Sequence, residues 1–572
     1  MKNRYWSDRA TAMLIIFSLL VTASLWAQTS RGTVAGTITD PSGAVIRGAQ
    51  VSLKSLATGI VRQANTNNEG AFRFDAVDLG AYEITATMQG FAAYKLQNVD
   101  VPANKTTTVE IGMKLASTAE EVVNVEGSLA GLELQRTEER RAVTISQLEL
   151  KDVPLVGQNS LNLITTVPGA VQTELGGSLD SGIGSINGAR ARSNNFLVDG
   201  MDNNDISVAG PVATLTNNDA IQEVSIQTSN FSAEYGRAGG AVVNQITKAG
   251  TNSLHGTGAW VYRSEVFNAT TLPQRAGAGP GASLHEIKPP FKENLPAFTI
   301  GGPVVIPHLY DGRNKTFFFA AGQWDRFSAG ADQAQFSNVP TAHGAAVLQG
   351  LAAKCPNVAL YLNSLQGLTA PTASGAIDIS LPATVFNSTG SCNGAPRTGL
   401  TVPMGPVTRT FPSVQLTNNN QIRIVHNPSD RQFMSFRWYW IDFNGGVTAG
   451  TAGLSPTFDA SQTNRQLSGA FTDTYVISSQ TTNEFRFSYG RAHLDVPIQP
   501  GIGATLPRFV VSGISSFGTS STFPQGRVSN NYQYQDTIGM VRGKHSIRTG
   551  VEFLRQLAKP VMSAAPYPRF RS

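Results

Sequence analysis

The second half of the chain consists of segments in which apolar and polar positions alternate. The clearest one sets Phe485, Phe487 and Tyr489, together with Asn483, against Glu484 and Arg486. This alternation has the period of a β-strand with one apolar and one polar face. The segments that share it are "GTGAWVYR", "AFTIGGPVVI", "KTFFFAAGQWDRF", "RQFMSFRWYWIDF", "QLSGAFTDTYVI", "TNEFRFSYGRA", "NNYQYQDTIGMV" and "KHSIRTGVEFLRQ".

The length and faces of these segments favour a transmembrane β-barrel. Each segment is about ten residues long, which matches a tilted membrane strand. Phe436, Trp438 and Trp440 lie opposite Arg437 and Tyr439, and aromatic residues near strand ends fit interfacial girdles. A soluble sandwich, whose strands also alternate, is the alternative.

The connections between the segments alternate in length. The short ones, Asn427–Asp430 and Val541–Lys544, are predicted periplasmic turns. The long ones, 268–290 and 328–417, are predicted irregular extracellular loops. Short turns on one side and long loops on the other are typical of outer-membrane barrels.

Residues 31–115 form shorter alternating segments separated by turns, which predicts a small β-sandwich. The stretches "GTVAGTITDPSGAVIRGAQVSL" and "TNNEGAFRFDAVDLGAYEITATMQGF" resemble the carboxypeptidase regulatory-like domain, a transthyretin-like sandwich. The resemblance implies a fold and no catalytic activity. No H-x-x-E zinc pattern occurs in the sequence.

Residues 116–250 lack the regular alternation of the flanking regions. A helix is predicted through "ERRAVTISQLELKDVP", and a Gly-rich stretch follows it. A strand is predicted at Asn194–Val198, followed by a turn that carries Asp199, Asp202 and Asp205. Asp and Asn side chains accept backbone N–H bonds in turns. A calcium loop is the lesser alternative, because no bidentate Glu follows at the required spacing.

This middle region resembles the plug domain of TonB-dependent outer-membrane receptors of the Oar-like group. The matching stretches are "INGAR", "NNFLVDGMDNND" and "IQEVSIQTSNFSAEYGRAGGAVVNQITKAGTN". The resemblance implies three partners: a TonB-type periplasmic energy transducer, outer-membrane lipid and an extracellular ligand. It implies no cofactor. The residues of this sequence that we use as plug markers are Asn195, Asp199, Gly200, Asp202, Tyr235, Gly236 and Arg237.

In such receptors a short extended motif before the plug, the TonB box, pairs with a strand of the transducer. A Val-rich stretch suits this β-augmentation, because backbone bonds supply affinity. The alternative is an ordinary strand that leads into the plug. The candidate box residues are Glu120, Glu121, Val122, Val123, Asn124 and Val125.

The N-terminus has the order of a secretory signal. Lys2, Arg4 and Arg9 precede an apolar stretch, and a small-residue cleavage site follows Ala27. A retained membrane anchor is the alternative. Together with the barrel pattern, this signal predicts export to the outer membrane of a Gram-negative cell.

Composition and motifs exclude several classes of function. Charged residues are 15% of the chain, and its net charge of +5 contains no basic run, so no nucleic-acid partner is predicted. No nucleophile-elbow, Walker or zinc-peptidase pattern occurs, so we predict no catalytic residues, no metal and no enzyme. Cys355 and Cys392 could close a loop as a disulfide, but no C-x-x-C spacing exists.

The predicted fold is therefore mainly β, with a transthyretin-like β-sandwich, an α+β plug and part of a transmembrane antiparallel β-barrel. The predicted divisions are 1–27 for the signal, 31–115 for the sandwich, 116–250 for the plug and 254–572 for the partial barrel. A plug of this size needs a wide lumen, as in 22-stranded transporters. We accordingly expect the chain to be the front part of a longer receptor.

Three functions remain open at this stage. The first is ligand import through a plugged barrel. The second is a surface adhesion or polymer-binding protein on the same scaffold. The third is a soluble carbohydrate-binding array of sandwiches.

Overall fold

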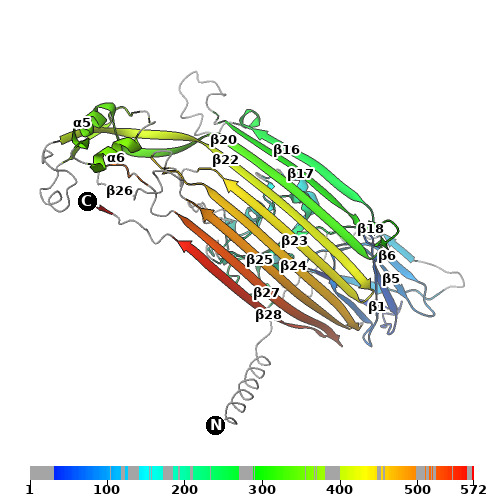
Figure 1. The fold of residues 1–572 in the computed structure, drawn as a ribbon. Coiled ribbons are helices and arrows are strands. Elements are labelled where there is room, and N and C mark those ends of the chain that lie inside the picture. Colours follow the sequence, from blue (N-terminus) through cyan, green and yellow to red (C-terminus); the bar gives the residue numbers. More distant parts are fainter. Residues whose placement is uncertain are drawn as a thin grey trace, which may run out of the picture.

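The computed structural model arranges the chain as a sandwich, a plug and one large curved sheet (Figure 1). The signal segment with Ala27, the residues Glu120–Val122, and Cys355 and Cys392 lie outside the described residues. The described residues are 31–103, 105–116, 123–126, 141–153, 155, 158–171, 184–190, 193–206, 210–231, 234–269, 288, 290–353, 356–365, 368, 370–379, 400–447, 453–454, 458–478, 480–497, 509–510, 514–516, 518, 524–543, 545–562 and 570–571.

The N-terminal region is a β-sandwich around one apolar core. One sheet has the order β4-β1-β7 and the other β3-β2-β5-β6-β8. Inward residues such as Val34, Leu53, Ile84 and Ile111 are fully buried between the sheets. The strands are β1 (Gly32–Thr39), β2 (Gln50–Ser55), β3 (Val61–Asn65), β4 (Ala71–Val77), β5 (Gly80–Thr87), β6 (Tyr94–Val101), β7 (Thr106–Gly112) and β8 (Val123–Glu126).

The plug is built on a five-stranded sheet with the order β13-β12-β15-β14-β9. Short helical segments and the sheet enclose an apolar core that includes Leu161, Ile164 and Val243. The elements are β9 (Arg141–Ser146), α2 (Gln147–Asp152), η2 (Ser160–Thr166), β10 (Ala170–Val171), β11 (Ser185–Ile186), β12 (Asn195–Val198), β13 (Met201–Asp202), η4 (Asn218–Ala220), β14 (Ile221–Ser229) and β15 (Val242–Thr247).

The helix predicted through residues 139–154 is wrong in its first half, where the structure has strand β9. Val143, Thr144 and Ile145 are β-branched and pair with β14 in an antiparallel ladder. Helix α2 begins only after Ser146, whose side chain accepts from the backbone N–H of Glu149, while the Glu149 carboxylate accepts from the Ser146 N–H. This reciprocal capping box fixes the boundary between the strand and the helix.

Nine long antiparallel strands form a curved sheet, here called the wall. Their order is β16-β17-β20-β22-β23-β24-β25-β27-β28, and β21 pairs with β22 beside this path. Among the described residues no helix is long and apolar enough to cross a membrane. The strands are β16 (His255–Ser264), β17 (Phe291–Pro303), β20 (Thr316–Pro340), β21 (Gly375–Ile379), β22 (Leu400–Ser429), β23 (Gln432–Gly445), β24 (Gln462–Ser478), β25 (Thr481–Val496), β27 (Gln525–Arg542) and β28 (His545–Met562).

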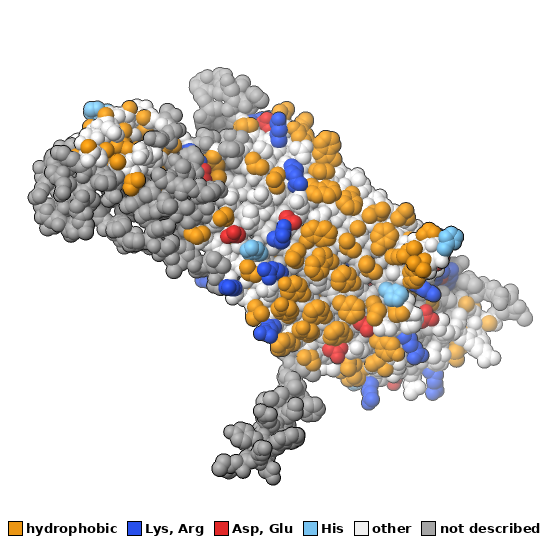
Figure 2. Space-filling model, viewed as in Figure 1, with side chains coloured by type: hydrophobic (Ala, Val, Ile, Leu, Met, Phe, Trp, Pro, Cys, Tyr) orange, Lys and Arg blue, Asp and Glu red, His pale blue; other side chains and the backbone are white. Residues whose placement is uncertain are grey.

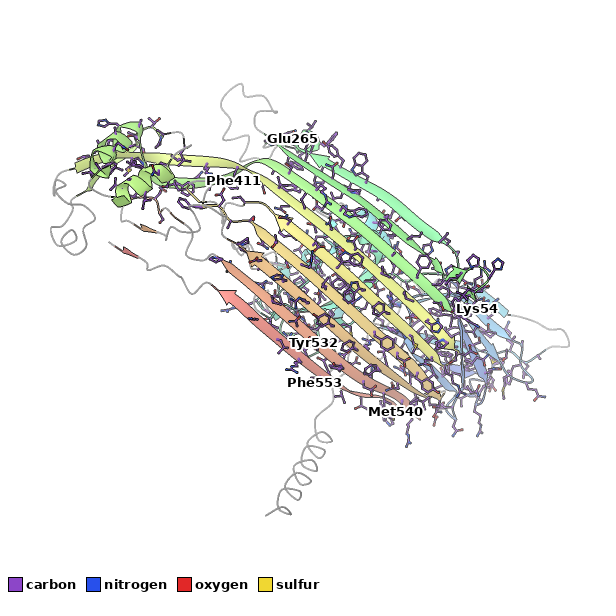
Figure 3. The ribbon with its side chains drawn as sticks, viewed as in Figure 1. Lys54, Glu265, Phe411, Tyr532, Met540 and Phe553 are labelled. Carbon is purple, nitrogen blue, oxygen red and sulfur yellow. The ribbon has the colours of Figure 1, made fainter. Side chains whose placement is uncertain are left out.

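The two faces of the wall differ as the alternation predicts. Phe436, Phe485 and Phe553 are 43%, 38% and 59% exposed, whereas their neighbours Arg437 and Glu484 are each 3% exposed. Figure 2 shows apolar side chains spread over the outward face, and Tyr532 and Phe553 lie on it in Figure 3. The plug lies behind the other face (Figure 1). The sequence prediction of a mainly β fold with a two-faced barrel sheet is confirmed.

The stretch predicted as an irregular loop over 328–417 is wrong for most of its described residues. β20 and β22 extend through it, and the helices α5 (Ala342–Ala352) and α6 (Pro356–Ser364) lie on the extension. Leu348, Tyr361 and Met404 belong to a separate apolar core there. Arg409 forms a buried ion pair with Asp459 beside this core. The extension lies at the end of the wall opposite the sandwich (Figure 1).

Candidate functional site at the junction of plug, wall and sandwich

A tight hairpin turn at Asp199 and Gly200 joins β12 to β13. Val198 pairs with Met201, and φ is +50° at Asp199 and +76° at Gly200. Two consecutive left-handed residues make the two-residue turn that favours Asp-Gly. The Gly200 N–H donates to Asn244 Oδ1 at 3.0 Å, which holds the turn on the neighbouring strand β15.

Asp199 connects this turn to the inner face of the wall. Its Oδ2 lies 2.9 Å from Arg437 Nη1, and its Oδ1 lies 3.7 Å from Arg423 Nη1. The Thr247 N–H and hydroxyl both donate to the same carboxylate at 2.8 Å. Burial alone would raise the pKa of Asp199, but the two guanidinium groups and Thr247 hold it below its ordinary value.

The next two aspartates contact another wall strand, β27. Asp205 Oδ2 lies 2.7 Å from Arg527 Nη2. Asp202 accepts from Asn531 Nδ2 at 3.1 Å, and its own backbone N–H donates to Gln533 Oε1 at 2.8 Å. Burial raises the pKa of Asp202, against the effect of its hydrogen bonds. The turn at Asp199 is thus joined to β22 and β23, and the residues that follow the turn are joined to β27.

The remaining plug markers lie around the same turn. Asn195 Nδ2 donates to the Gly236 carbonyl at 3.2 Å, and Arg237 Nη1 lies 3.5 Å from Asp202 Oδ1. Tyr235 is buried in a small cluster with Leu197 and Val242. The structure therefore brings all seven marker residues into one neighbourhood.

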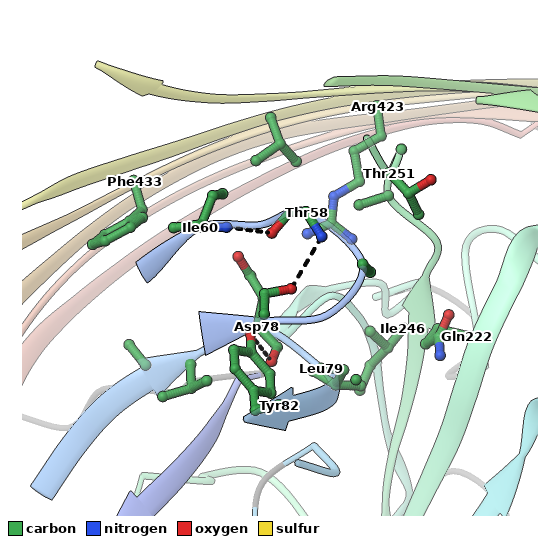
Figure 4. A pocket seen from close by; sticks show the side chains of 18 of the residues that line it. Thr58, Ile60, Asp78, Leu79, Tyr82, Gln222, Ile246, Thr251, Arg423 and Phe433 are labelled. Carbon is green, nitrogen blue, oxygen red and sulfur yellow. Dashed lines mark hydrogen bonds between the residues drawn. The ribbon is translucent and has the colours of Figure 1, made fainter. Parts of the chain in front are cut away.

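A cavity of about 190 Å³ lies where the sandwich, plug and wall meet. Figure 4 shows Arg423 and Phe433 from the wall above Thr58 and Asp78 of the sandwich, with the plug residue Ile246 beside them. The Arg62 guanidinium of the sandwich lies 5.3 Å from the centre of the Phe433 ring. Burial lowers the pKa of Arg62 to about 10.

The sandwich also contacts the plug directly. Glu223 lies in the plug strand β14. Its side chain accepts a hydrogen bond at 2.8 Å from the backbone N–H of Ala103, two residues after the end of the sandwich strand β6. Burial raises the pKa of the Glu223 carboxyl to about 7. This group therefore changes its charge near neutral pH.

The described part of the candidate TonB box, Val123–Val125, belongs to strand β8. It is not a member of the plug sheet. Instead β8 pairs in parallel with β6 at the edge of the sandwich. Because β8 belongs to a sandwich sheet and the turn at Asp199 to the plug sheet, the box candidate and the plug markers form two separate places.

Sequence reasoning did not identify the wall residues that receive the aspartates. Arg423, Arg437 and Arg527 project from the face that the alternation assigns to the interior, and this was the available signal. Within the described residues, no three His, Cys, Asp or Glu side chains are grouped so that they could hold a metal ion.

Comparisons with known proteins identify two regions of the chain. Residues 246–570, more than half of the chain, match the family model described as outer membrane beta barrel domain, and residues 33–114 match the carboxypeptidase regulatory-like domain. The TonB-dependent transporter Oar of Myxococcus xanthus is 24% identical over 321 residues. That alignment covers 54% of this chain and 28% of the relative.

Solved structures of transporters were also matched. The outer membrane transporter YddB from Escherichia coli has a TM-score of 0.47 at 11% identity, over 73% of this chain and 48% of that one. The ferric enterobactin receptor of Pseudomonas aeruginosa has a TM-score of 0.39 at 11% identity, over 74% of this chain and 56% of that one. The chain thus spans about half the length of these structures. By its match over residues 246–570, the chain belongs to the outer-membrane β-barrel family.

Proposed function

We propose that this chain supplies the sandwich, plug and first wall strands of a TonB-dependent outer-membrane transporter. Its short-turn end, with the sandwich, faces the periplasm, and the extension that carries α5 and α6 faces the cell exterior. The divisions at 31–115, 116–250 and 254–572 are the proposed domain limits, and 1–27 is the proposed export signal. Ligand captured outside passes the plug when a TonB-type protein acts on the segment Glu120–Val125.

One observation carries this proposal: ion pairs between plug aspartates and wall arginines are among the contacts that hold the plug to the wall. Asp199 meets Arg423 and Arg437, and Asp205 meets Arg527. Charged pairs set the position of two surfaces strongly, yet water and ions can replace each partner once the interface opens. An interface that includes such pairs suits a plug that closes the lumen and later rearranges.

A cysteine staple between plug and wall tests the proposal. The Thr216 hydroxyl donates to Gln323 Oε1 at 2.7 Å, so Thr216→Cys and Gln323→Cys would place two thiols across the interface. In the longer protein that contains this chain, with Cys355 and Cys392 replaced by Ser, a short bis-methanethiosulfonate cross-linker that joins the two thiols should abolish uptake of radiolabelled cargoes from a panel of siderophores, glycans and peptides. Binding at the cell surface should persist, and a reductant should restore uptake.

Deletion of Glu120–Val125 gives the second arm of the same experiment. Transport predicts lost uptake with intact surface binding, because the energy transducer no longer has its segment. A surface adhesion protein on the same scaffold predicts that neither the staple nor the deletion changes what the cells bind or take up. That result would contradict the transport proposal.

A further inference from the structure

Strand β8 occupies an interaction surface on the edge of the sandwich. Its four residues pair in register with β6: Val123 with Tyr94, Asn124 with Lys95, Val125 with Leu96, and Glu126 with Gln97. The strand is the last member of the order β3-β2-β5-β6-β8. It is separated from the sandwich strand β7 by residues 113–122 and from the plug strand β9 by residues 127–140.

A bulge in β6 lies at one end of the described ladder. Asn98 has φ of +59°, and the β5–β6 register shifts at this point. Such a bulge increases the local twist and interrupts pairing. Among the described residues, the last pair of the ladder to β8 is at Gln97, next to this bulge. A short parallel ladder is weak enough to open and close, and parallel pairs are slightly less stable than antiparallel ones.

The surface that holds β8 is itself attached to the wall and the plug. Arg31 Nη1 donates to the Thr474 hydroxyl at 2.6 Å, and Asn67 Nδ2 donates to the Gly543 carbonyl at 3.3 Å. Beyond the end of β6, the Ala103 N–H donates to Glu223 of the plug. A segment that remains paired with β6 therefore cannot move relative to the wall.

We propose that the edge of β6 is a docking strand for residues 123–126. An energy-transducing partner must displace this segment from β6 before the partner can pull on the plug. This inference rests on the proposed function, because it assigns the segment to that partner. The sandwich then determines what fraction of the molecules has residues 123–126 free to bind the partner. Opening of the ladder precedes any tension on β9, the edge strand of the plug sheet that follows in the chain.

A disulfide across the ladder tests the docking strand without changing Glu120–Val125. The variant carries Gln97→Cys and Glu126→Cys, with Cys355 and Cys392 replaced by Ser. The matched control is Thr37→Cys with Glu110→Cys, an exposed register pair between the parallel strands β1 and β7 of the sandwich. Both pairs should oxidise to similar extents. A control that cross-links while the 97–126 pair does not would overturn the docking strand.

The second readout is binding of the purified periplasmic domain of a TonB-type transducer to the full chain in detergent. Since only the released segment binds, the oxidised 97–126 variant should bind at least about tenfold more weakly than the reduced one. The oxidised control should bind as its reduced form does. Equal affinity of the two 97–126 forms would show that the partner adds to the segment in place, which contradicts displacement.

Failure of the proposed function gives a different result from failure of this inference. If the unmodified protein and both reduced variants fail to bind the transducer domain, the segment is not the TonB box. The proposed control of partner binding by β6 is then wrong. Cross-linking and hydrogen exchange of the β6 amides still decide whether β8 pairs with β6. If binding occurs, the β6 amides at 94–97 should lose protection when the domain is added.

Discussion

The plug and the sandwich both rest on the wall, but they use different chemistry. The plug meets it through carboxylates at Asp199 and Asp205 that face arginines. The sandwich contacts include Arg62 over the Phe433 ring and the Arg31 bond to a threonine hydroxyl. Ion pairs between buried groups demand one register, whereas a cation over a ring tolerates small shifts. The plug is thus the more precisely positioned of the two.

The largest expected difference comes from Asp199→Asn. This change leaves Arg423 and Arg437 without their carboxylate partner in a buried place, and breaking such a pair costs about 3–5 kcal/mol. The free energy of unfolding, measured by denaturant titration in detergent, should fall by that amount. Asp442→Asn is the control, because Asp442 and Arg465 form an exposed pair worth about 1 kcal/mol or less. Equal losses in the two variants would contradict the account.

A charge on the outward face of the wall should have the next largest effect. Phe436 is the fifth of the fourteen residues of β23 and is 43% exposed. Phe436→Arg should destabilise the membrane-inserted protein by about 2–4 kcal/mol, whereas Tyr475→Arg, near the end of β24, should cost about 1 kcal/mol or less. Folding into lipid vesicles at graded urea concentrations measures both. A larger cost at Tyr475 would argue against the lipid-facing assignment.

The contact between sandwich and plug should depend on pH through Glu223. In the folded protein the pKa of Glu223 is about 7, above its ordinary value of 4.5. Between pH 4.5 and 7 the folded state therefore binds a proton that the unfolded state releases, and the free energy of unfolding falls as the pH rises through this range. Glu223→Gln should remove this slope, with a gain of about 2–3 kcal/mol over the wild type at pH 8 and little gain at pH 4. Thermal unfolding at both pH values tests this. Parallel pH profiles for the two proteins would refute it.

The smallest effect is expected where the sandwich meets Phe433. A partly buried cation over an aromatic ring contributes about 1 kcal/mol. In a double-mutant cycle with Arg62→Leu and Phe433→Leu, the coupling energy should be about that size. Additive losses would mean that the two side chains do not interact.

Local patterns explain what the sequence predicted correctly. A strand with one face in lipid and one against the plug repeats every two residues, so Phe485 and Glu484 already indicate opposite faces. The Asp and Asn residues after Val198 likewise predict a turn, because their side chains accept local backbone N–H bonds. These features depend on neighbours in the chain.

Features that depend on distant residues could not be predicted in this way. Asp199 and Arg437 are 238 positions apart, and the local sequence around either residue does not predict their contact. The strand at 141–146 looks helical until β14 is placed beside it. In the same way, β8 is a strand because it pairs with β6 at the edge of the sandwich sheet. The predicted disulfide and the signal cleavage site stay predictions, since they lie outside the described residues.

The central claim is that the wall turns its aromatic face to lipid and its charged face to the plug. The most direct test is a nitroxide scan of positions 434–440 on β23 in the protein reconstituted into lipid vesicles. The account predicts that accessibility to oxygen, which concentrates in the bilayer, peaks at 434, 436, 438 and 440 and falls at 435, 437 and 439. A flat profile, or peaks at the odd positions, would contradict it.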